Sequence, residues 1–177
     1  MFLNSDNCLL LIIDIQEKLI NAVFNKEVVA KNAEIVSKTA KILNIPAVVT
    51  EQYPKGLGNT VLELPENSKV FEKTSFNALV EDNIKNVVVS SGKKQIIVMG
   101  IETHICVHQT VDALIENGFD VTVVSDACGS RAEKEYFAGL DAMKFNGAKI
   151  KTTEMVLFEL LKTAKHQNFK EIQALIK

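Results

Sequence analysis

Three residues that could do chemistry lie at or just beyond strand-like runs that are far apart in the sequence. Asp14 ends the run CLLLIID, Lys73 ends the shorter run KVFEK, and Cys106 follows QIIVMG at the start of a segment with helical periodicity. A carboxylate can accept a proton, an ammonium group can favour a thiolate, and a thiolate is a nucleophile. Brought to one place, these side chains would suit covalent attack on a carbonyl-type carbon.

Each of these residue types also has an ordinary structural role. Asp14 could cap the helix that follows it, and Lys73 could be a solvated lysine among charged neighbours. Cys106 could pack in the core, because free cysteine is among the most buried residue types. It could also bind a metal. Nucleophile, metal ligand and packed apolar residue are therefore three open interpretations of Cys106.

Apolar runs rich in β-branched residues alternate with helical segments, which is the pattern of a parallel sheet covered by helices. We predict a single α/β domain over residues 1–177, a doubly wound, Rossmann-like and mostly parallel sheet of about six strands flanked by helices. The expected strands are 8–14, 46–51, 95–100, 120–126 and 148–153, with a weaker one at 69–73, and the expected helices are 26–44, 103–118, 131–147, 154–164 and 168–177. Such sheets bind ligands beyond the carboxyl ends of their strands.

The expected place of Cys106 near a helix N-terminus has a consequence for its thiol. Unpaired backbone N–H groups and the positive end of the helix dipole favour the thiolate, so we expect a lowered pKa. The same N–H groups could stabilise an oxyanion. A nearby Lys73 would favour the thiolate further, and Asp14 could accept the thiol proton.

The composition is that of an ordinary globular protein, with 47% hydrophobic and 24% charged residues in a chain of 177. Twenty Lys and Arg against 22 Asp and Glu indicate neither a nucleic-acid partner nor an anionic membrane surface. The apolar run near the start is too short to span a membrane and follows no basic segment. We therefore expect a cytoplasmic protein with no membrane contact. Its three cysteines, Cys8, Cys106 and Cys128, should be reduced thiols because they lack ligand spacing.

Three segments carry a resemblance to a known superfamily. DIQEKL (14–19), EKTSF (72–76) and GIETHICVHQTVDAL (100–114) resemble, in order, the signatures of the isochorismatase-like cysteine hydrolases, which include nicotinamidases and N-carbamoylsarcosine amidases. EQYPKGLGNTV (51–61) and VVSDACGSR (123–131) are most similar to the branch called isochorismatase domain-containing proteins. The resemblance implies a Cys–Asp–Lys triad that hydrolyses a small amide or ureido substrate through a covalent thio-intermediate.

Carried over by position, the resemblance implies that Asp14 accepts the proton, Lys73 is the cation and Cys106 is the nucleophile. It also implies a cis peptide bond between Ile101 and Glu102, with the backbone N–H groups of Glu102 and Cys106 forming the oxyanion hole. The residues at positions that line the pocket in the family, and hence the expected substrate contacts, are Gln16, Tyr53, Phe76 and Ile105.

The chain departs from the nicotinamidases where those proteins hold a metal. They use an Asp-x-His pair and a further histidine after the second strand, whereas TEQYPKGLG (50–58) has no histidine. His104 and His108 have a spacing that could bind zinc, but no third ligand is evident. We therefore expect no metal and no organic cofactor.

As partners we expect a small-molecule substrate and, as in other family members, further copies of the chain in a dimer or larger homo-oligomer. An alternative keeps the fold but not the turnover. The protein would then be a redox-sensitive thiol protein or an assembly scaffold. The occurrence of all three catalytic residue types favours the hydrolase, because a scaffold needs no Asp, Lys and Cys in one crevice.

Overall fold

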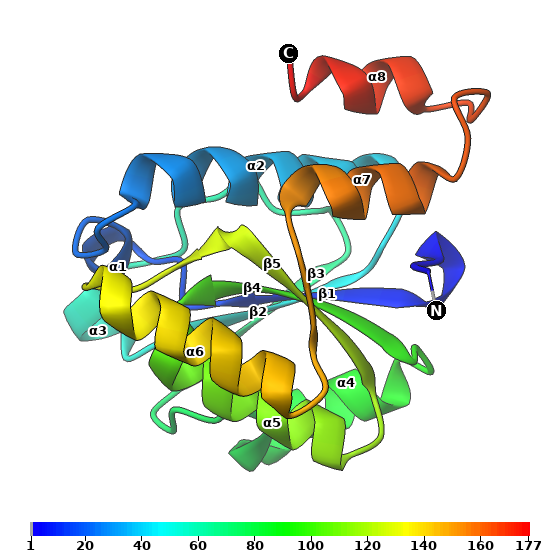
Figure 1. Ribbon diagram of the computed structural model, residues 1–177. Helices are drawn as coiled ribbons and strands as arrows, with labels where there is room; N and C mark the ends of the chain where they lie inside the picture. The colour runs from blue at the N-terminus through cyan, green and yellow to red at the C-terminus, as the bar shows by residue number, and fades with distance from the viewer. Residues whose placement is uncertain (1) are drawn as a thin grey trace.

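A computed structural model describes residues 2–177 and shows one six-stranded sheet (Figure 1). Every neighbouring pair of strands is parallel, and the order is β3-β2-β1-β4-β5-β6. The strands are β1 (Cys8–Ile13), β2 (Ala47–Gln52), β3 (Ser68–Lys73), β4 (Gln95–Ile101), β5 (Asp120–Gly129) and β6 (Lys149–Lys151). The predicted doubly wound α/β sheet is confirmed, and the weakest predicted strand is β3 at one edge.

Helices cover both faces of the sheet (Figure 1). One face carries α2 (Lys26–Ile42) and α7 (Thr153–Leu161), and the other carries α4 (Asp82–Ser90), α5 (His108–Glu116) and α6 (Glu133–Phe145). The last helix, α8 (Phe169–Ala174), packs on α2 and α7. The two short helices are α1 (Glu17–Ile20) and α3 (Pro54–Leu57). No helix within residues 2–177 is long and apolar enough to cross a membrane.

The central strands have buried side chains on both faces, which explains their continuous apolar sequence. All six residues of β1 and all seven of β4 are buried. Along β1, Leu10 and Ile12 pack toward α2 and α7, whereas Leu9, Leu11 and Ile13 pack in the cluster formed with α4, α5 and α6. Burial of each large aliphatic side chain stabilises the fold by about 1.5–3 kcal/mol.

The direction of winding reverses between β1 and β4. The chain adds β2 and β3 on one side of β1, and then returns to add β4, β5 and β6 on the other. A doubly wound sheet leaves a crevice beyond the strand ends where this reversal occurs. Asp14 directly follows β1, and Cys106 lies five residues beyond β4. The topology therefore places both residues beside the crevice.

Two helical segments differ from the sequence prediction. Helix α4 was not predicted, because its run of three valines has the β-branched character of a strand, although Ile84 and Val88 bury one helical face. The predicted helix 103–118 begins with a π-helical turn, Thr103–Val107, before α5. We call this π-helical segment the Cys106 turn. Its wide geometry appears in the hydrogen bond from Val107 N to Glu102 O, 3.2 Å long.

Candidate functional site

Asp14 and Lys73 form a buried ion pair at the carboxyl edge of the sheet. Lys73 Nζ lies 2.7 Å from Asp14 Oδ2, and neither side chain is exposed to solvent. An isolated charge in such a place would be very unfavourable, so each group depends on the other. The pair bridges the ends of β1 and β3, which are separated in the sheet by β2.

Further hydrogen bonds fix both members of the pair. The Thr50 hydroxyl donates to Asp14 Oδ1 at 2.7 Å, so both carboxylate oxygens are engaged. Lys73 Nζ also donates to Gln52 Oε1 at 2.5 Å and to the Ser75 carbonyl at 3.1 Å. An ammonium group has three N–H donors, and these three acceptors use all of them. The orientation of the pair is thus set before any substrate arrives.

The backbone around the pair is unusual at two positions. Asp14 has φ 52°, a left-handed conformation that is uncommon for residues other than glycine and that clusters at functional sites. Gly100, at the end of β4, has φ 155°, and a Cβ there would lie 2.2 Å from the Ile13 carbonyl oxygen. Only glycine therefore allows the ends of β1 and β4 to approach this closely.

Cys106 is the fourth residue of the Cys106 turn and is 7% exposed. Burial raises the pKa of its thiol to about 12, the Asp14 carboxylate raises it as well, and the Lys73 ammonium lowers it. The predicted lowering of this pKa is therefore wrong for the resting protein, because desolvation and Asp14 outweigh Lys73. The thiol is protonated at neutral pH. Its proton must leave when the sulfur reacts.

The other two cysteines lie in the sheet. Cys8 and Cys128 are both 0% exposed, and burial raises their pKa values to about 11 and about 12. All three cysteines are free thiols. Of the three, Cys106 is the one with measurable exposure and the one whose pKa responds to both Asp14 and Lys73.

Glu102 directly precedes the Cys106 turn. The peptide bond between Ile101 and Glu102 is cis. The Glu102 carbonyl accepts hydrogen bonds from Ile105 N at 3.0 Å and Val107 N at 3.2 Å. The backbone N–H groups expected to form the oxyanion hole, those of Glu102 and Cys106, therefore lie only four residues apart around one turn.

The four expected substrate contacts fall into two groups. Tyr53 and Phe76 are 58% and 54% exposed, and Ile105 is half-buried, so all three can meet a ligand. Gln16 is fully buried, and its amide bonds only to backbone: Nε2 donates to the carbonyls of Gln52 and Gly58, and Oε1 accepts from Gln52 N. This arrangement differs from the expected contact with substrate, and it makes Gln16 a brace for the segment after β2.

A small hollow of about 180 Å³ opens beside Lys73; its lining residues are Tyr53, Pro54, Glu72, Lys73, Thr74 and Glu81. Two polar residues of the site, Thr50 and Gln52, were not identified from the sequence. Thr50 stands opposite Ile13 in the parallel register, directly beside the residue that precedes Asp14. The signal available in the sequence was Thr50 itself, a polar residue near the end of the otherwise apolar run PAVVTE.

The histidines have partners other than a metal. His104 Nδ1 lies 3.1 Å from Ser130 Oγ, and His108 Nε2 lies 3.1 Å from Asp112 Oδ2. Across residues 2–177, no group of three or more His, Cys, Asp or Glu side chains is arranged to hold a metal ion. The groups that the structure brings together here are the Asp14 carboxylate, the Lys73 ammonium group and the Cys106 thiol.

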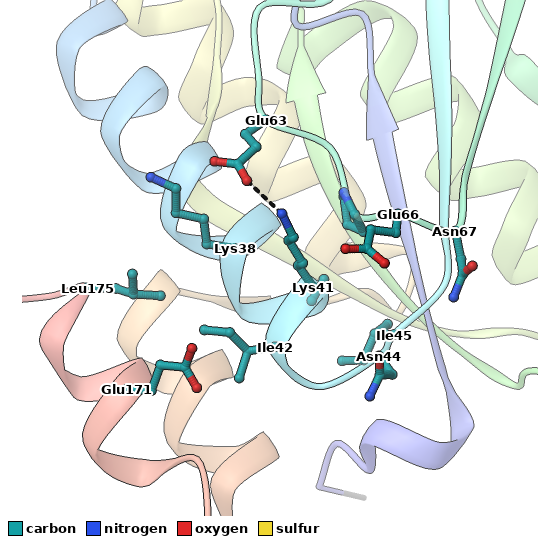
Figure 2. A pocket seen from close by; sticks show the side chains of 12 residues that line it. Lys38, Lys41, Ile42, Asn44, Ile45, Glu63, Glu66, Asn67, Glu171 and Leu175 are labelled. Atoms are coloured by element: carbon teal, nitrogen blue, oxygen red, sulfur yellow. Dashed lines mark hydrogen bonds and ion pairs between the residues drawn. The ribbon is translucent and has the colours of Figure 1, made fainter.

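A larger hollow of about 470 Å³ lies elsewhere, at the end of α2 that leads into the start of β2 (Figure 2). It contains the ion pair between Lys41 Nζ and Glu63 Oε1, 2.8 Å apart and well exposed. Exposed pairs of this kind stabilise a fold by only about 0–1 kcal/mol. The hollow is at the amino edge of the sheet, opposite to Asp14, Lys73 and Cys106, and contains none of them.

A doubly wound α/β sheet with a carboxylate, an ammonium group and a cysteine near its switch point is an arrangement that suits an enzyme acting through a nucleophile. Comparison with known proteins gives the family. The Isochorismatase domain family matches residues 8–155, and the chain belongs to this family.

Full-length relatives support the assignment. Isochorismatase domain-containing protein 2 of Danio rerio is 40% identical over 175 residues, which cover 98% of this chain and 89% of the relative. The structure of MAR1 ribonuclease from Caenorhabditis elegans is 35% identical with a TM-score of 0.92, covering 99% of this chain and 92% of the other.

The bacterial protein YcaC is a more distant neighbour. Its structure from Pseudomonas aeruginosa, with hexane-2,5-diol and covalent acrylamide, is 26% identical with a TM-score of 0.90 and covers 98% of this chain and 91% of its own. The structure from Escherichia coli, an octameric hydrolase of unknown specificity, is also 26% identical, with a TM-score of 0.86 and coverage of 99% and 95%.

Proposed function

We propose that this protein is a cysteine hydrolase that cleaves a C–N bond in a small amide or ureido substrate. Cys106 is the nucleophile, Asp14 the proton acceptor and Lys73 the cation. The observation that carries the proposal is the fully buried Asp14–Lys73 pair beside the Cys106 thiol. Stability alone does not explain such a pair, because packed apolar residues of similar volume often stabilise a core as well or better.

The first step is removal of the thiol proton. Because the resting thiol has a raised pKa, attack requires a base within reach, and Asp14 is the carboxylate that acts on Cys106. As the proton passes to Asp14, negative charge moves to the sulfur. The Lys73 ammonium then faces a thiolate and a neutral carboxyl group, so the total charge of the three groups is unchanged.

The second step is attack on the substrate. The S–C bond forms as charge moves to the substrate oxygen, where the N–H groups of Glu102 and Cys106 stabilise it. The C–N bond then breaks, and the amine or ammonia takes the proton from Asp14. Water gives a proton to Asp14 and adds to the thioester-like carbon. The S–C bond then breaks, the acid leaves, and the sulfur takes the proton back from Asp14, which restores the Cys106 thiol. No cofactor takes part.

The YcaC structure with covalent acrylamide supports a reactive nucleophile within this fold, because acrylamide is an electrophile that alkylates thiols. We do not extend the ribonuclease activity named for the C. elegans protein to this chain. The present chain has a formal net charge of −2. Electrostatic attraction to phosphates is a main source of nucleic-acid affinity, and a net negative charge does not provide it. A thiol that is 7% exposed also suits a small substrate better than a polymer.

The structure offers little support for the redox-sensor alternative. Reactive sensor cysteines are accessible and have lowered pKa values, whereas the thiols here are buried with raised pKa values. We also propose a cytoplasmic location, and three free, buried thiols are compatible with a reducing compartment.

We also propose that the chain assembles as a homo-oligomer. The E. coli neighbour is octameric, and α6, which packs against the Cys106 turn, carries Phe137 and Phe145 at 53% and 91% exposure. Large aromatic side chains exposed on one helix are typical of surfaces that another subunit covers.

The hydrolase proposal is tested with Cys106→Ala and Cys106→Ser. Release of ammonia from a panel of small primary amides and ureido compounds is measured for each variant and for the matched control Cys128→Ala. We expect turnover in the wild type and the control, and a loss of at least about 10³-fold in both Cys106 variants, because the nucleophile is removed. Circular dichroism should show the fold intact. Hydrolysis that continues in either Cys106 variant would refute the nucleophile assignment.

A further inference from the structure

Arg131 has an unusual place in both the composition and the structure. It is the single arginine among the 20 lysine and arginine residues of the chain. It lies just after β5, and its side chain is 64% exposed. Its partner is Glu102, the residue that directly precedes the Cys106 turn, and the Glu102 side chain is 12% exposed.

Arg131 holds the Glu102 carboxylate through both oxygens. Nη2 of Arg131 lies 2.8 Å from Glu102 Oε1, and both Nε at 3.1 Å and the Arg131 backbone N at 2.9 Å donate to Oε2. A planar guanidinium can make this two-pronged contact and a lysine ammonium cannot. This geometry explains why position 131 has an arginine, although lysine is used at all the other Lys and Arg positions of the chain.

The neighbouring residue holds the other side of the same segment. Ser130 is fully buried, and its hydroxyl lies 3.1 Å from His104 Nδ1. The carbonyl of Ser130 accepts from Phe24 N at 3.0 Å, which ties this position to the loop before α2. Ser130 and Arg131 thus hold Glu102 and His104, one residue on each side of Thr103.

The Glu102 backbone is restrained from two directions. Its carbonyl accepts from Ile105 N and Val107 N inside the Cys106 turn, and its carboxylate is held from outside by Arg131. Burial acts to raise the pKa of Glu102, but the hydrogen bonds and charge of Arg131 outweigh it and lower that pKa. The Glu102 carboxylate is therefore ionised at neutral pH, and its ion pair with Arg131 is formed.

We propose that Arg131 is a positioning residue, which acts through the Glu102 carboxylate to hold the Glu102 N–H where it stabilises the oxyanion. This inference rests on the proposed function, since it assumes the oxyanion step. It assigns no contact between Arg131 and the substrate. Its effect should appear only in reactions that develop charge on a carbonyl oxygen.

Two reagents separate that effect from the reactivity of the thiol. With 4-nitrophenyl acetate, the Cys106 S–C bond forms and the C–O bond to nitrophenolate breaks, and charge passes through the carbonyl oxygen. With iodoacetamide, the S–C bond forms as the C–I bond breaks, and no charge develops on a carbonyl oxygen. The rates of acetylation and of alkylation of Cys106 are measured by quenching the reaction, digesting the protein and recording the mass of the Cys106 peptide. The proteins compared are wild type, Arg131→Ala, Arg131→Lys, Glu102→Gln and the Arg131→Ala/Glu102→Gln double variant.

We expect Arg131→Ala to slow acetyl transfer to Cys106 by about 10- to 100-fold, because displacement of an oxyanion donor has effects of this order. Alkylation by iodoacetamide should stay within about twofold of wild type. Arg131→Lys should be intermediate, and the double variant should be no slower than Arg131→Ala, because both changes remove one interaction. Equal slowing of both reactions, or of neither, would overturn the proposal.

A chemical test avoids any folding defect in the variants. Treatment of the folded wild type with 2,3-butanedione in borate modifies arginine, and Arg131 is the single target in the chain. Acetyl transfer should slow by the same factor as in Arg131→Ala, and Arg131→Lys should be unaffected by the reagent. An unchanged acetylation rate after complete modification would contradict the proposal. Failure of the proposed function is read separately, as nitrophenolate release at the same rate in wild type and in Cys106→Ala.

Discussion

Both oxygens of the Asp14 carboxylate have partners before any substrate binds, and this has consequences for how the group works as a base. Thr50 holds Oδ1, and Lys73 holds Oδ2. A base held this firmly has a fixed direction toward the thiol, so little reorganisation is needed when the proton moves. The Thr50 hydroxyl is the part of this arrangement that can be removed without removing a charge.

Thr50→Val tests the role of that hydroxyl. A hydrogen bond to a charged group contributes about 1.5–3 kcal/mol, so the free energy of unfolding should fall by about that amount. Turnover should fall by at least about 10-fold, because Asp14 loses one of its restraints. Urea unfolding and steady-state kinetics measure the two effects.

The matched control is Thr39→Val, since Thr39 is equally buried but bonds to the Ile35 carbonyl within α2. The control should lose about 1 kcal/mol or less and keep wild-type turnover. Equal turnover in the two variants would mean that Thr50 has no special relation to Asp14.

The Cys106 turn packs closely against α6 at Gly139. A Cβ on Gly139 of α6 would lie 2.9 Å from both the Cα and the N of His104 in the Cys106 turn. Here glycine is needed for close approach and not for an unusual φ. The position of Cys106 therefore depends on a helix that contributes no reacting group.

Gly139→Ala separates packing from helix propensity. Alanine is favoured over glycine inside a helix by about 1 kcal/mol, so α6 alone would gain stability. Because the new methyl group meets the backbone of His104, we expect the variant to lose stability and to lose about 10-fold or more in turnover. Thermal unfolding and kinetics measure both.

Asp141→Ala, an exposed change on the same helix, is the control and should keep wild-type turnover. A Gly139→Ala variant that is more stable and fully active would show that the turn can shift freely.

The strands were predictable, whereas the turn that carries the nucleophile was not. Strands β1 and β4 are buried on both faces, and that environment leaves a continuous apolar run in the sequence. The π-helical geometry of the Cys106 turn leaves no such trace, because the turn is held by α6 and by Ser130 and Arg131 after β5, which are distant in sequence. Helix α4 was missed for a related reason, since its valines also suit a strand.

At the scale of the whole molecule, the order of the strands brings together segments that are distant in the sequence. Asp14 and Cys106, for example, are 92 residues apart. The sequence was sufficient to place Asp14, Lys73 and Cys106 at strand ends, since that required only the order of strands. It could not supply their surroundings. The hydrogen bonds of Thr50 and Gln52 follow from strand register, and the raised pKa of Cys106 follows from burial by many residues.

Buried neutral thiols make the stability of the fold sensitive to alkaline pH. The pKa values of Cys8, Cys106 and Cys128 are raised from 9.0 to about 11, about 12 and about 12. Above about pH 9 the unfolded chain releases these protons while the folded chain keeps them, so stability falls with rising pH. The contribution is fully present below about pH 9 and is lost as the pH rises toward 12.

Urea unfolding midpoints under reducing conditions should therefore be level between pH 7 and 8.5 and should decline steadily above pH 9. Cys128→Ala should be less stable at every pH because it leaves a cavity, but its decline above pH 9 should be shallower. A wild-type midpoint that stays level up to pH 11 would contradict the raised pKa values.

The central claim is that Cys106 forms a covalent bond to the substrate, and acid-quenched mass spectrometry tests it most directly. Wild-type protein is mixed with each compound of a panel of small amides and ureido compounds, quenched within the first turnovers, and its mass and peptide map are recorded. We expect an adduct equal to the substrate less its amine, located on the Cys106 peptide and absent from Cys106→Ala. Turnover accompanied by an adduct on another residue, or turnover that persists in Cys106→Ala, would contradict the account.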